Sequence, residues 1–171
     1  MKRILGIDPG TRFCGYGVVD FVPRSKPLYI ECGVIQLDAS LSLPQRLYQL
    51  STDLRDVILE FQPQHLAVES IFYGKNVQSA LRLGYARGVV VMLVAEYSLE
   101  FYEYAPNAIK RAVSGHGHAR KEDMQRVVMW QCGLASPPDS DAADALAIAL
   151  CHSFSQQLPE AFKSSKKRRD V

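Results

Sequence analysis

The sequence predicts an α/β fold, a mixed five-stranded sheet flanked by helices. The first third of the chain is rich in Ile, Val and Tyr and is interrupted by Gly and Pro, which is typical of consecutive strands. Beyond it, short apolar segments alternate with segments whose apolar residues recur every three or four positions, as in alternating strands and helices. A chain of 171 residues is long enough for one domain with a substantial core, which we expect to span residues 1–155.

The first half of the chain contains the early strands and one amphipathic helix. Three strands are expected at Ile4–Asp8, Gly15–Phe21 and Leu28–Leu37. The helix that follows has Pro44 in its first turn and Pro63 beyond its end. Its apolar residues fall on one face: Leu43, Leu47, Leu50, Leu54, Val57 and Phe61. The segment His65–Glu69 has no polar alternation, so we expect a strand in the centre of the sheet.

The second half alternates helices with one further strand. We expect a long helix from Asn76 to about Glu96, a strand at Leu99–Tyr104, a short helix from Pro106, and helices from about Lys121 to Gln131 and from Ser140 to about Phe154. Gly133 would stop the helix from Lys121 to Gln131. Residues 156–171 are polar and basic, and they are predicted to form a disordered tail.

The net charge of +2 at pH 7 hides an asymmetry between the tail and the rest of the chain. Residues 163–171 hold five basic side chains and one acid, a charge of +4, so the remainder carries −2. Bulk charge therefore does not indicate nucleic-acid binding, which would need a local basic patch and a metal to cancel acidic charge. Because no apolar stretch reaches the roughly 18 residues that span a bilayer, and the N-terminus lacks the apolar region of a signal peptide, we expect a cytoplasmic protein without a membrane segment.

The cysteines and histidines do not have the spacing of a metal site. None of the four cysteines forms a Cys-x-x-Cys pair, and no histidine lies at zinc spacing from one, so we expect buried thiols that act as small hydrophobes. His116 and His118 suggest zinc at first sight, but they lack an obvious third or fourth ligand. A polar Gly-x-Gly loop is the better interpretation, and no role is assigned to either histidine.

Four acidic residues stand where apolar segments end or where a helix face is otherwise apolar: Asp8, Glu69, Asp141 and Asp144. Asp8 and Glu69 close strands, and α/β proteins usually place their sites at strand ends. Asp141 and Asp144 are three residues apart with only alanines between them, so they share a helix face. A carboxylate in such a place is costly unless its charge is compensated. A divalent metal with oxygen ligands, magnesium or manganese, would compensate all four at one edge of the sheet.

Each acid also has a structural interpretation. Asp favours the first position of turns, so Asp8 would suit the turn Asp-Pro-Gly-Thr. Asp141 would suit a helix first turn, where the helix dipole favours acids. Asp139 and Ser140, however, offer better cap positions, and Asp144 lies a turn deeper. The four acids together favour a metal site over chance.

Aromatic and basic residues near these acids suggest contacts to nucleic acid. Phe72 and Tyr73 follow Glu69 closely, where a ring can stack on a base or simply pack under the loop. Lys110 and Lys121 flank the glycine loop and are candidates for phosphate contacts. Solvated surface is the usual fate of such basic residues, and of the two arginines on the long helix, Arg82 and Arg87.

Several motifs together resemble the RuvC family, the bacterial Holliday-junction resolvases with a ribonuclease H-like fold. They are Gly6-Ile7-Asp8-Pro9-Gly10, Glu69 with Phe72-x-x-Lys75-Asn76, Ala86-Arg87-Gly88, Tyr104-Ala105-Pro106 and Asp141-Ala142-Ala143-Asp144-Ala145-Leu146-Ala147. They occur in the family's order from residue 3 to about residue 150. The basic tail matches no motif of the family.

The resemblance implies a structure-selective endonuclease for recombination and repair. It would resolve four-way DNA junctions by symmetric paired nicks that leave 5′-phosphate and 3′-hydroxyl ends. The implied catalytic and metal-binding residues are Asp8, Glu69, Asp141 and Asp144, holding two Mg²⁺ ions that Mn²⁺ can replace. The implied DNA contacts are Phe72, Lys75, Asn76, Lys110 and Lys121. The implied partners are four-way junction DNA, a second copy of the chain bound through the helix after Asn76, and the branch-migration proteins RuvA and RuvB.

Two other functions fit parts of the sequence. Asp8-Pro9-Gly10-Thr11 also resembles the first phosphate loop of actin-like ATPases and sugar kinases, but those proteins need two lobes and this chain supplies one. A junction-binding protein without catalysis is the second alternative. Four anions facing DNA phosphates argue against it, since a pure binder has no need of them.

Overall fold

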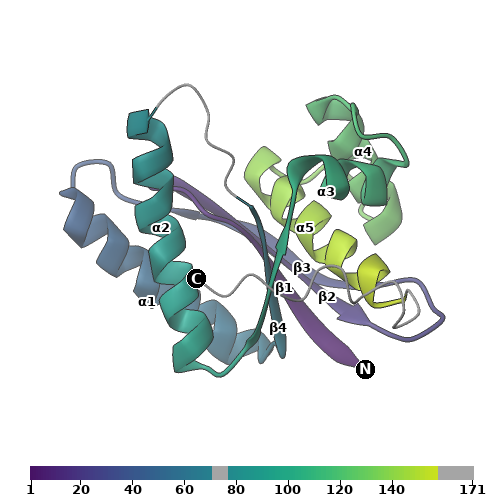
Figure 1. Ribbon diagram of the computed structural model, residues 1–171, viewed down its shortest axis with the longest axis horizontal. Helices are drawn as coiled ribbons and strands as arrows, with labels where there is room; N and C mark the ends of the chain where they lie inside the picture. The colour runs from purple at the N-terminus through teal and green to yellow at the C-terminus, as the bar shows by residue number, and fades with distance from the viewer. Residues whose placement is uncertain (71–76, 158–171) are drawn as a thin grey trace.

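The computed structural model describes residues 1–70 and 77–157, which form one five-stranded sheet and five helices (Figure 1). The elements in chain order are β1 (Lys2–Asp8), β2 (Phe13–Phe21), β3 (Leu28–Gln36), α1 (Leu43–Phe61), β4 (His65–Glu69), α2 (Val77–Glu96), β5 (Glu100–Tyr104), α3 (Pro106–Ser114), α4 (Lys121–Cys132) and α5 (Ser140–Gln156). The strand order is β3-β2-β1-β4-β5. β1, β2 and β3 pair antiparallel, whereas β4 is parallel to both β1 and β5. The predicted mixed five-stranded sheet is therefore confirmed.

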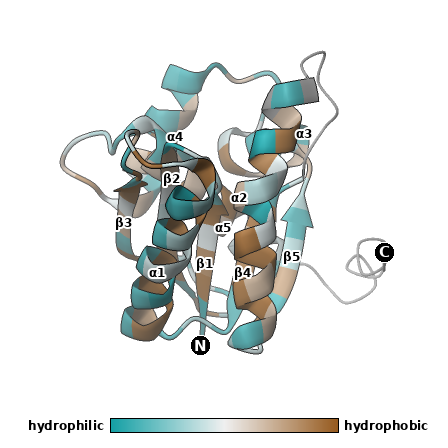
Figure 2. Cartoon of the chain, turned by 90° about the vertical axis from the view of Figure 1, so that its left-hand side faces the viewer, coloured by the Kyte–Doolittle hydropathy of each residue, from teal (hydrophilic) through white to brown (hydrophobic). Residues whose placement is uncertain are grey.

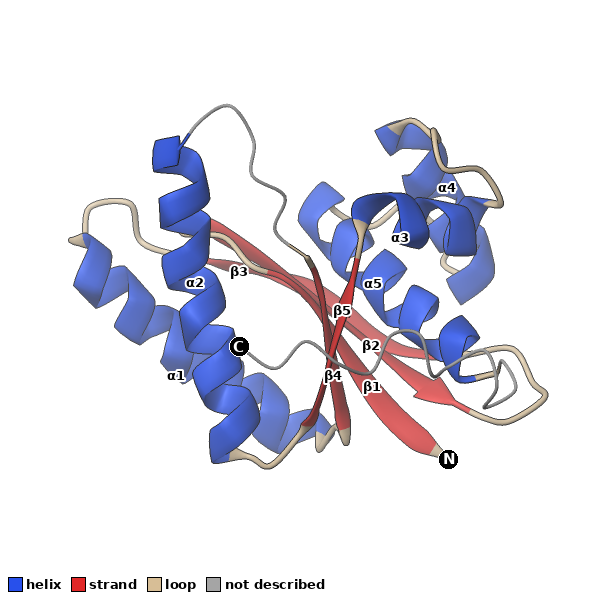
Figure 3. Ribbon diagram, in the orientation of Figure 1, coloured by secondary structure: helices blue, strands red, loops and turns tan. Residues whose placement is uncertain are grey.

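Helices cover both faces of the sheet, with α1 and α2 on one face and α3, α4 and α5 on the other (Figure 3). Alternation along β1 explains the two layers. Leu5 and Ile7 are fully buried in the core beneath α1 and α2, while Ile4 lies in the core beneath α3, α4 and α5. Figure 2 looks onto α1 and α2 from outside the sheet, and hydrophobic residues are visible on the outward side of α2. Gly6 and Asp8 share the face of Ile4, so Asp8 points toward α5.

Glycines let α5 lie directly on β1 and β2. A Cβ atom at Gly6 or Gly15 would meet the backbone oxygen of Ala145 or Asp141, respectively, at under 3.0 Å, and one at Gly17 would meet the backbone of Leu146. The helix contributes small residues to the same contact: Ala142, Ala143, Ala145, Ala147 and Ala149 are all buried. This close approach places the first turns of α5 beside the end of β1.

The observed boundaries differ from the predicted ones by one or two residues. β1 and β2 each begin two residues earlier than predicted. α5 extends to Gln156, and Gln157 donates from Nε2 to the carbonyl oxygen of Ser25 at 2.8 Å, so the predicted start of the tail at residue 156 is wrong. The last turn stays helical because α5 packs along the whole sheet. Residues 158–171, the rest of the predicted tail, lie outside the described residues.

All four cysteines are free thiols, but only Cys14 and Cys151 are buried. Cys32 and Cys132 are partly exposed, so the prediction of four buried thiols is half wrong. Within residues 1–70 and 77–157, no helix is long and apolar enough to cross a membrane.

A buried chain of hydrogen bonds lies at the end of the sheet where β4 begins. Lys2 Nζ can only donate, so His65 Nε2 accepts at 2.8 Å and His65 Nδ1–H donates to His152 Nε2 at 2.7 Å. His152 Nδ1–H then donates to the hydroxyl of Tyr104 at 2.6 Å. The Tyr104 hydroxyl donates to Ser155 Oγ at 2.7 Å, and Ser155 donates to the carbonyl of His152. The donor Lys2 at one end and the carbonyl acceptor at the other therefore require the same donor-to-acceptor direction throughout. Each of the two imidazole rings carries one proton.

From this hydrogen-bond network we expect the protein to lose stability in acid. Burial first, then the neighbouring His65, lowers the pKa of His152 to about 3 from 6.5. Above pH 6.5 the ring is neutral in both the folded and the unfolded protein and contributes no pH dependence. Below pH 6.5 the imidazole binds a proton in the unfolded protein but stays neutral in the folded protein. The free energy of unfolding therefore falls by about 1.4 kcal/mol for each pH unit that the pH is lowered.

The test compares the wild type with His152→Gln, because Asp8 and other groups titrate in the same pH range. We expect the free energy of unfolding of the wild type, relative to that of His152→Gln, to fall by about 2 kcal/mol from pH 6.5 to pH 5 in urea unfolding. His116→Gln, at an exposed histidine, is the matched control and should show no such difference. An advantage that stays constant over this range would contradict the account.

Candidate active site

Three carboxylates meet where β1 ends and α5 begins. One oxygen from each of Asp8, Asp141 and Asp144 lies within 4.8 Å of the others. Asp8 is the last residue of β1 and pairs with Gly15 on β2, and the backbone of Asp141 lies directly over Gly15. Asp144 follows one helical turn later on the same face. The glycine contact between sheet and helix therefore brings these acids together.

The carboxylates repel one another in a partly buried place. Burial, then the charges of Asp144, Glu69 and Asp141, raises the pKa of Asp8 to about 7, and Lys121 acts in the opposite direction. A raised carboxyl pKa means that the negative form lacks sufficient positive charge nearby. A divalent cation would supply that charge, and carboxylate oxygens are the donors that magnesium and manganese prefer. The residues present thus fit a divalent metal.

Glu69 faces the same site from the neighbouring strand. It ends β4, which runs parallel to β1 with Val68 opposite Ile7. Glu69 does not belong to the three-residue group within 4.8 Å, but its charge raises the pKa of Asp8. Burial, and then Asp144, raises the pKa of Glu69 itself, while Lys110 lowers it. Glu69 is thus electrostatically coupled to Asp8 and Asp144.

Arg87 holds the end of β4 in place. Its side chain is 13% exposed, forms an ion pair with Glu103 on β5 and donates from Nη1 to the backbone oxygen of Glu69 at 2.7 Å. The expectation that Arg87 lies on a solvated surface is therefore wrong. Sequence reasoning missed this positioning role because the two partners are a carbonyl oxygen and a residue on another strand. The motif Ala86-Arg87-Gly88 was the available signal.

Both predicted lysines lie beside the acids. Lys121, the first residue of α4, forms an ion pair with Asp144 at 2.9 Å, and this hydrogen bond is the main reason that the pKa of Lys121 is raised. Lys110 lies on α3, and its charge lowers the pKa of Glu69. Two basic groups thus border the acidic cluster, where they could contact a phosphate.

The other predicted residues either lie outside the described residues or are exposed histidines that are not part of the cluster. Phe72, Lys75 and Asn76 lie outside the described residues. His116 and His118 are exposed. Among residues 1–70 and 77–157, the three aspartates are the sole group of three or more potential metal ligands close enough to share an ion.

A ribonuclease H-like sheet that carries acids at two adjacent strand ends and on the helix packed against them defines a class, the nucleases that cleave phosphodiester bonds. Residues 4–152 match the family described as crossover junction endodeoxyribonuclease RuvC. The chain belongs to the RuvC family. Among its relatives, the RuvC protein of Chloroflexus aggregans is 45% identical over 94% of this chain and 98% of the relative. The RuvC protein of Chromohalobacter salexigens is 46% identical over 90% of this chain and 82% of the relative.

Solved structures agree with this family. Thermus thermophilus RuvC in complex with a Holliday junction substrate has a TM-score of 0.85 and 33% identity, over 92% of this chain and 96% of the other. The yeast mitochondrial Holliday junction resolvase has a TM-score of 0.63 at 17% identity, which supports the fold alone.

Proposed function

We propose that this protein resolves four-way DNA junctions by cutting two opposed strands symmetrically. The observation that carries the proposal is the cluster of Asp8, Asp141 and Asp144 within 4.8 Å, in a chain of the RuvC family. The catalytic set is these three acids with Glu69, and we propose that they hold two Mg²⁺ ions, which Mn²⁺ can replace. The expected products carry 5′-phosphate and 3′-hydroxyl ends.

We assign the acids to metal binding and the nearby lysines to binding of the phosphate. The bound ions would activate a water molecule and stabilise the leaving oxygen. Asp8 approaches from the sheet and Asp141 and Asp144 from the helix, so the oxygens of these three residues converge from two elements, and Glu69 adds a fourth carboxylate at the end of β4. Lys121 and Lys110 provide positive charge at the rim, where the scissile phosphate must enter. Phe72, Lys75 and Asn76 are retained as proposed DNA contacts on the grounds of the resemblance.

The alternatives are not favoured. An actin-like nucleotide-binding lobe would not match the RuvC family over residues 4–152. A junction binder without catalysis would gain nothing from a cluster of anions that repels DNA. The resemblance also suggests RuvA and RuvB as partners and the cytoplasm as the place of action, and both remain expectations.

The experiment uses a four-way junction and a linear duplex of the same sequence, each labelled at the 5′ ends. With magnesium, we expect paired nicks at symmetric positions in the junction and little cutting of the duplex. Equal cutting of both substrates would contradict structure selectivity. Junction binding without cutting would favour the non-catalytic alternative.

We further propose a homodimer built on the exposed side of α2. Ala86, Val90 and Leu93 are fully buried against the sheet. The opposite side carries an uncharged stripe at helical spacing: Leu81, Gly84, Tyr85, Gly88, Val91, Met92 and Ala95. Four of these are large apolar residues at 42–57% exposure. A Cβ at Gly84 or Gly88 would meet nothing within 4 Å, so a second helix could approach closely there. A twofold pair would present two sites to a junction of matching symmetry.

Tyr85→Glu tests this dimer. Burying an unpaired charge in the interface is costly, so we expect monomers at micromolar concentration and a loss of paired cutting. Sedimentation of the wild type and the variant measures the effect. Leu59→Glu, at an exposed apolar residue on α1, is the control and should leave the dimer intact. A wild type that sediments as a monomer while still making paired cuts would contradict the proposal.

A further inference from the structure

A half-exposed aromatic ring lies beside the acidic cluster on the side away from β4. Phe13 is the first residue of β2 and is 48% exposed. It stands two positions before Gly15, the partner of Asp8, so it lies roughly 7 Å further along the strand. β4, which ends at Glu69, lies on the opposite side of β1 from β2. Phe13 and Glu69 therefore lie on opposite sides of Asp8 in the sheet.

Strand alternation places Phe13 on the face that carries the acids. Gly15 and Gly17 on β2 lie under α5, and Phe13 shares their face. Cys14, between Phe13 and Gly15, is instead buried in the core beneath α1 and α2. The cross-strand partner of Phe13 is Gln36, the last residue of β3, whose side chain is also exposed. An exposed ring and an exposed amide thus stand together next to the start of α5.

The turn before Phe13 is held firmly. The backbone oxygen of Thr11 accepts from Arg46 Nη1 on α1 at 2.9 Å, and that of Arg12 accepts from the amide of Leu37 at 2.9 Å. A Cβ at Gly10 would meet the carbonyl of Phe13, so the turn is tight. The backbone that carries the Phe13 ring is therefore held by contacts to α1 and β3.

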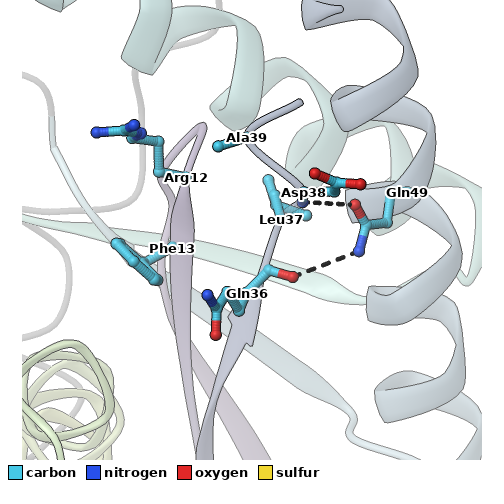
Figure 4. Close-up of a pocket in the computed structure, with 7 residues that line it drawn as sticks. All are labelled: Arg12, Phe13, Gln36, Leu37, Asp38, Ala39 and Gln49. Carbon is cyan, nitrogen blue, oxygen red and sulfur yellow. Dashed lines mark hydrogen bonds between the residues drawn. The ribbon is translucent and has the colours of Figure 1, made fainter. Parts of the chain in front are cut away.

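The surroundings of the ring are open and carry a cation. A hollow of about 610 Å³ lies between the Arg12–Phe13 turn, the end of β3 and Gln49. Figure 4 shows Arg12 and Phe13 pointing to one side, with Asp38 and Gln49 on the other. Gln49 is already engaged there, since it accepts from the amide of Asp38 and donates to the carbonyl of Gln36. The open side thus offers a ring, the free amide end of Gln36 and a guanidinium.

We propose that Phe13 stacks on a nucleobase of the cut strand, about one or two nucleotides from the scissile phosphate on the side away from β4. This inference rests on the proposed function, because the phosphate at the acids sets the position of the strand. The exposed guanidinium of Arg12 contacts the backbone of the same nucleotide. The amide of Gln36 reaches the edge of the stacked base, so this subsite contributes to the preferred cleavage sequence.

The test places the fluorescent base 2-aminopurine singly at each nucleotide around the cut site of a four-way junction. Calcium replaces magnesium, so that binding is read independently of cutting. We expect one position to be quenched by the wild type and by Phe13→Trp, but not by Phe13→Ala or Phe13→Leu. The leucine keeps the apolar contact and lacks a ring. Leu28→Ala, at an exposed residue at the far end of the paired strands β2 and β3, is the matched control and should behave as the wild type.

Cleavage gives the second readout. Base–aromatic stacking typically makes a difference of about 5-fold to 150-fold, so single-turnover cutting by Phe13→Ala should be slower by a factor in that range. Wild-type rates in Phe13→Ala together with an unchanged quenching pattern would overturn the inference. If the proposed function itself is wrong, the wild type will not cut the junction in magnesium. The fluorescence quenching in calcium does not depend on cutting, so it would still decide whether Phe13 stacks on a base.

Discussion

Asp8→Asn should abolish junction cutting while leaving junction binding intact. The substitution keeps the shape of the side chain and removes the charge that would hold a cation between β1 and α5. Loss of such charge stabilisation slows catalysis by roughly a thousandfold or more. Binding should be retained or slightly tighter, because one negative charge near the DNA phosphates disappears. Glu69→Gln, Asp141→Asn and Asp144→Asn should behave alike. Single-turnover cleavage and gel-shift titration measure the two effects.

Asp56→Asn, at an exposed acid on α1, is the matched control and should cut at the wild-type rate. A variant of one of the four acids that cuts at full speed would remove that residue from the site. Loss of folding in all four variants would make the acids structural instead. Circular dichroism distinguishes that outcome from a specific loss of catalysis.

Gly15→Ala should damage both the fold and the site. The added methyl group would overlap the backbone oxygen of Asp141, and neither β2 nor α5 can move aside as a flexible side chain can. Overpacking of this kind typically costs about 1–3 kcal/mol of stability. A shift of α5 by about 1 Å would also displace two acids, which can slow catalysis about a hundredfold. Urea unfolding and single-turnover cleavage measure the two effects.

Gly33→Ala is the matched control for this prediction. Gly33 lies in the neighbouring strand β3, and the three atoms nearest to a Cβ there all belong to the far end of the Tyr16 side chain rather than to a backbone. We expect wild-type cutting and a much smaller loss of stability. Equal effects at Gly15 and Gly33 would mean that the contact between β2 and α5 does not position the acids.

Hydrophobic periodicity was enough to predict the sheet, its helices and the placement of the four acids. Asp8 and Glu69 could be recognised because they end strands that are otherwise apolar, and Asp141 and Asp144 because alanines isolate them on one helix face. These signals are local in sequence. The boundaries were less accurate, since pairing between strands extends β2 back to Phe13 and packing extends α5 to Gln156.

Features that depend on contacts between distant segments could not be predicted. The close approach of α5 depends on glycines in two different strands, and no periodicity marks them. Arg87 looks like an ordinary surface residue until β4 and β5 are placed beside α2. The buried pair of His65 and His152 joins residues 87 positions apart through hydrogen bonds that only the fold creates. Long-range packing, rather than local propensity, supplies these details.

The most direct test of the central claim adds metal to a preformed complex. The wild-type protein is bound to a four-way junction labelled on all four strands in the presence of a chelator, and excess magnesium is then added. The carboxylate cluster predicts no product before the addition, and afterwards paired symmetric nicks with 5′-phosphate and 3′-hydroxyl ends. Product formed before magnesium is added, or none formed afterwards with either magnesium or manganese, would contradict the account.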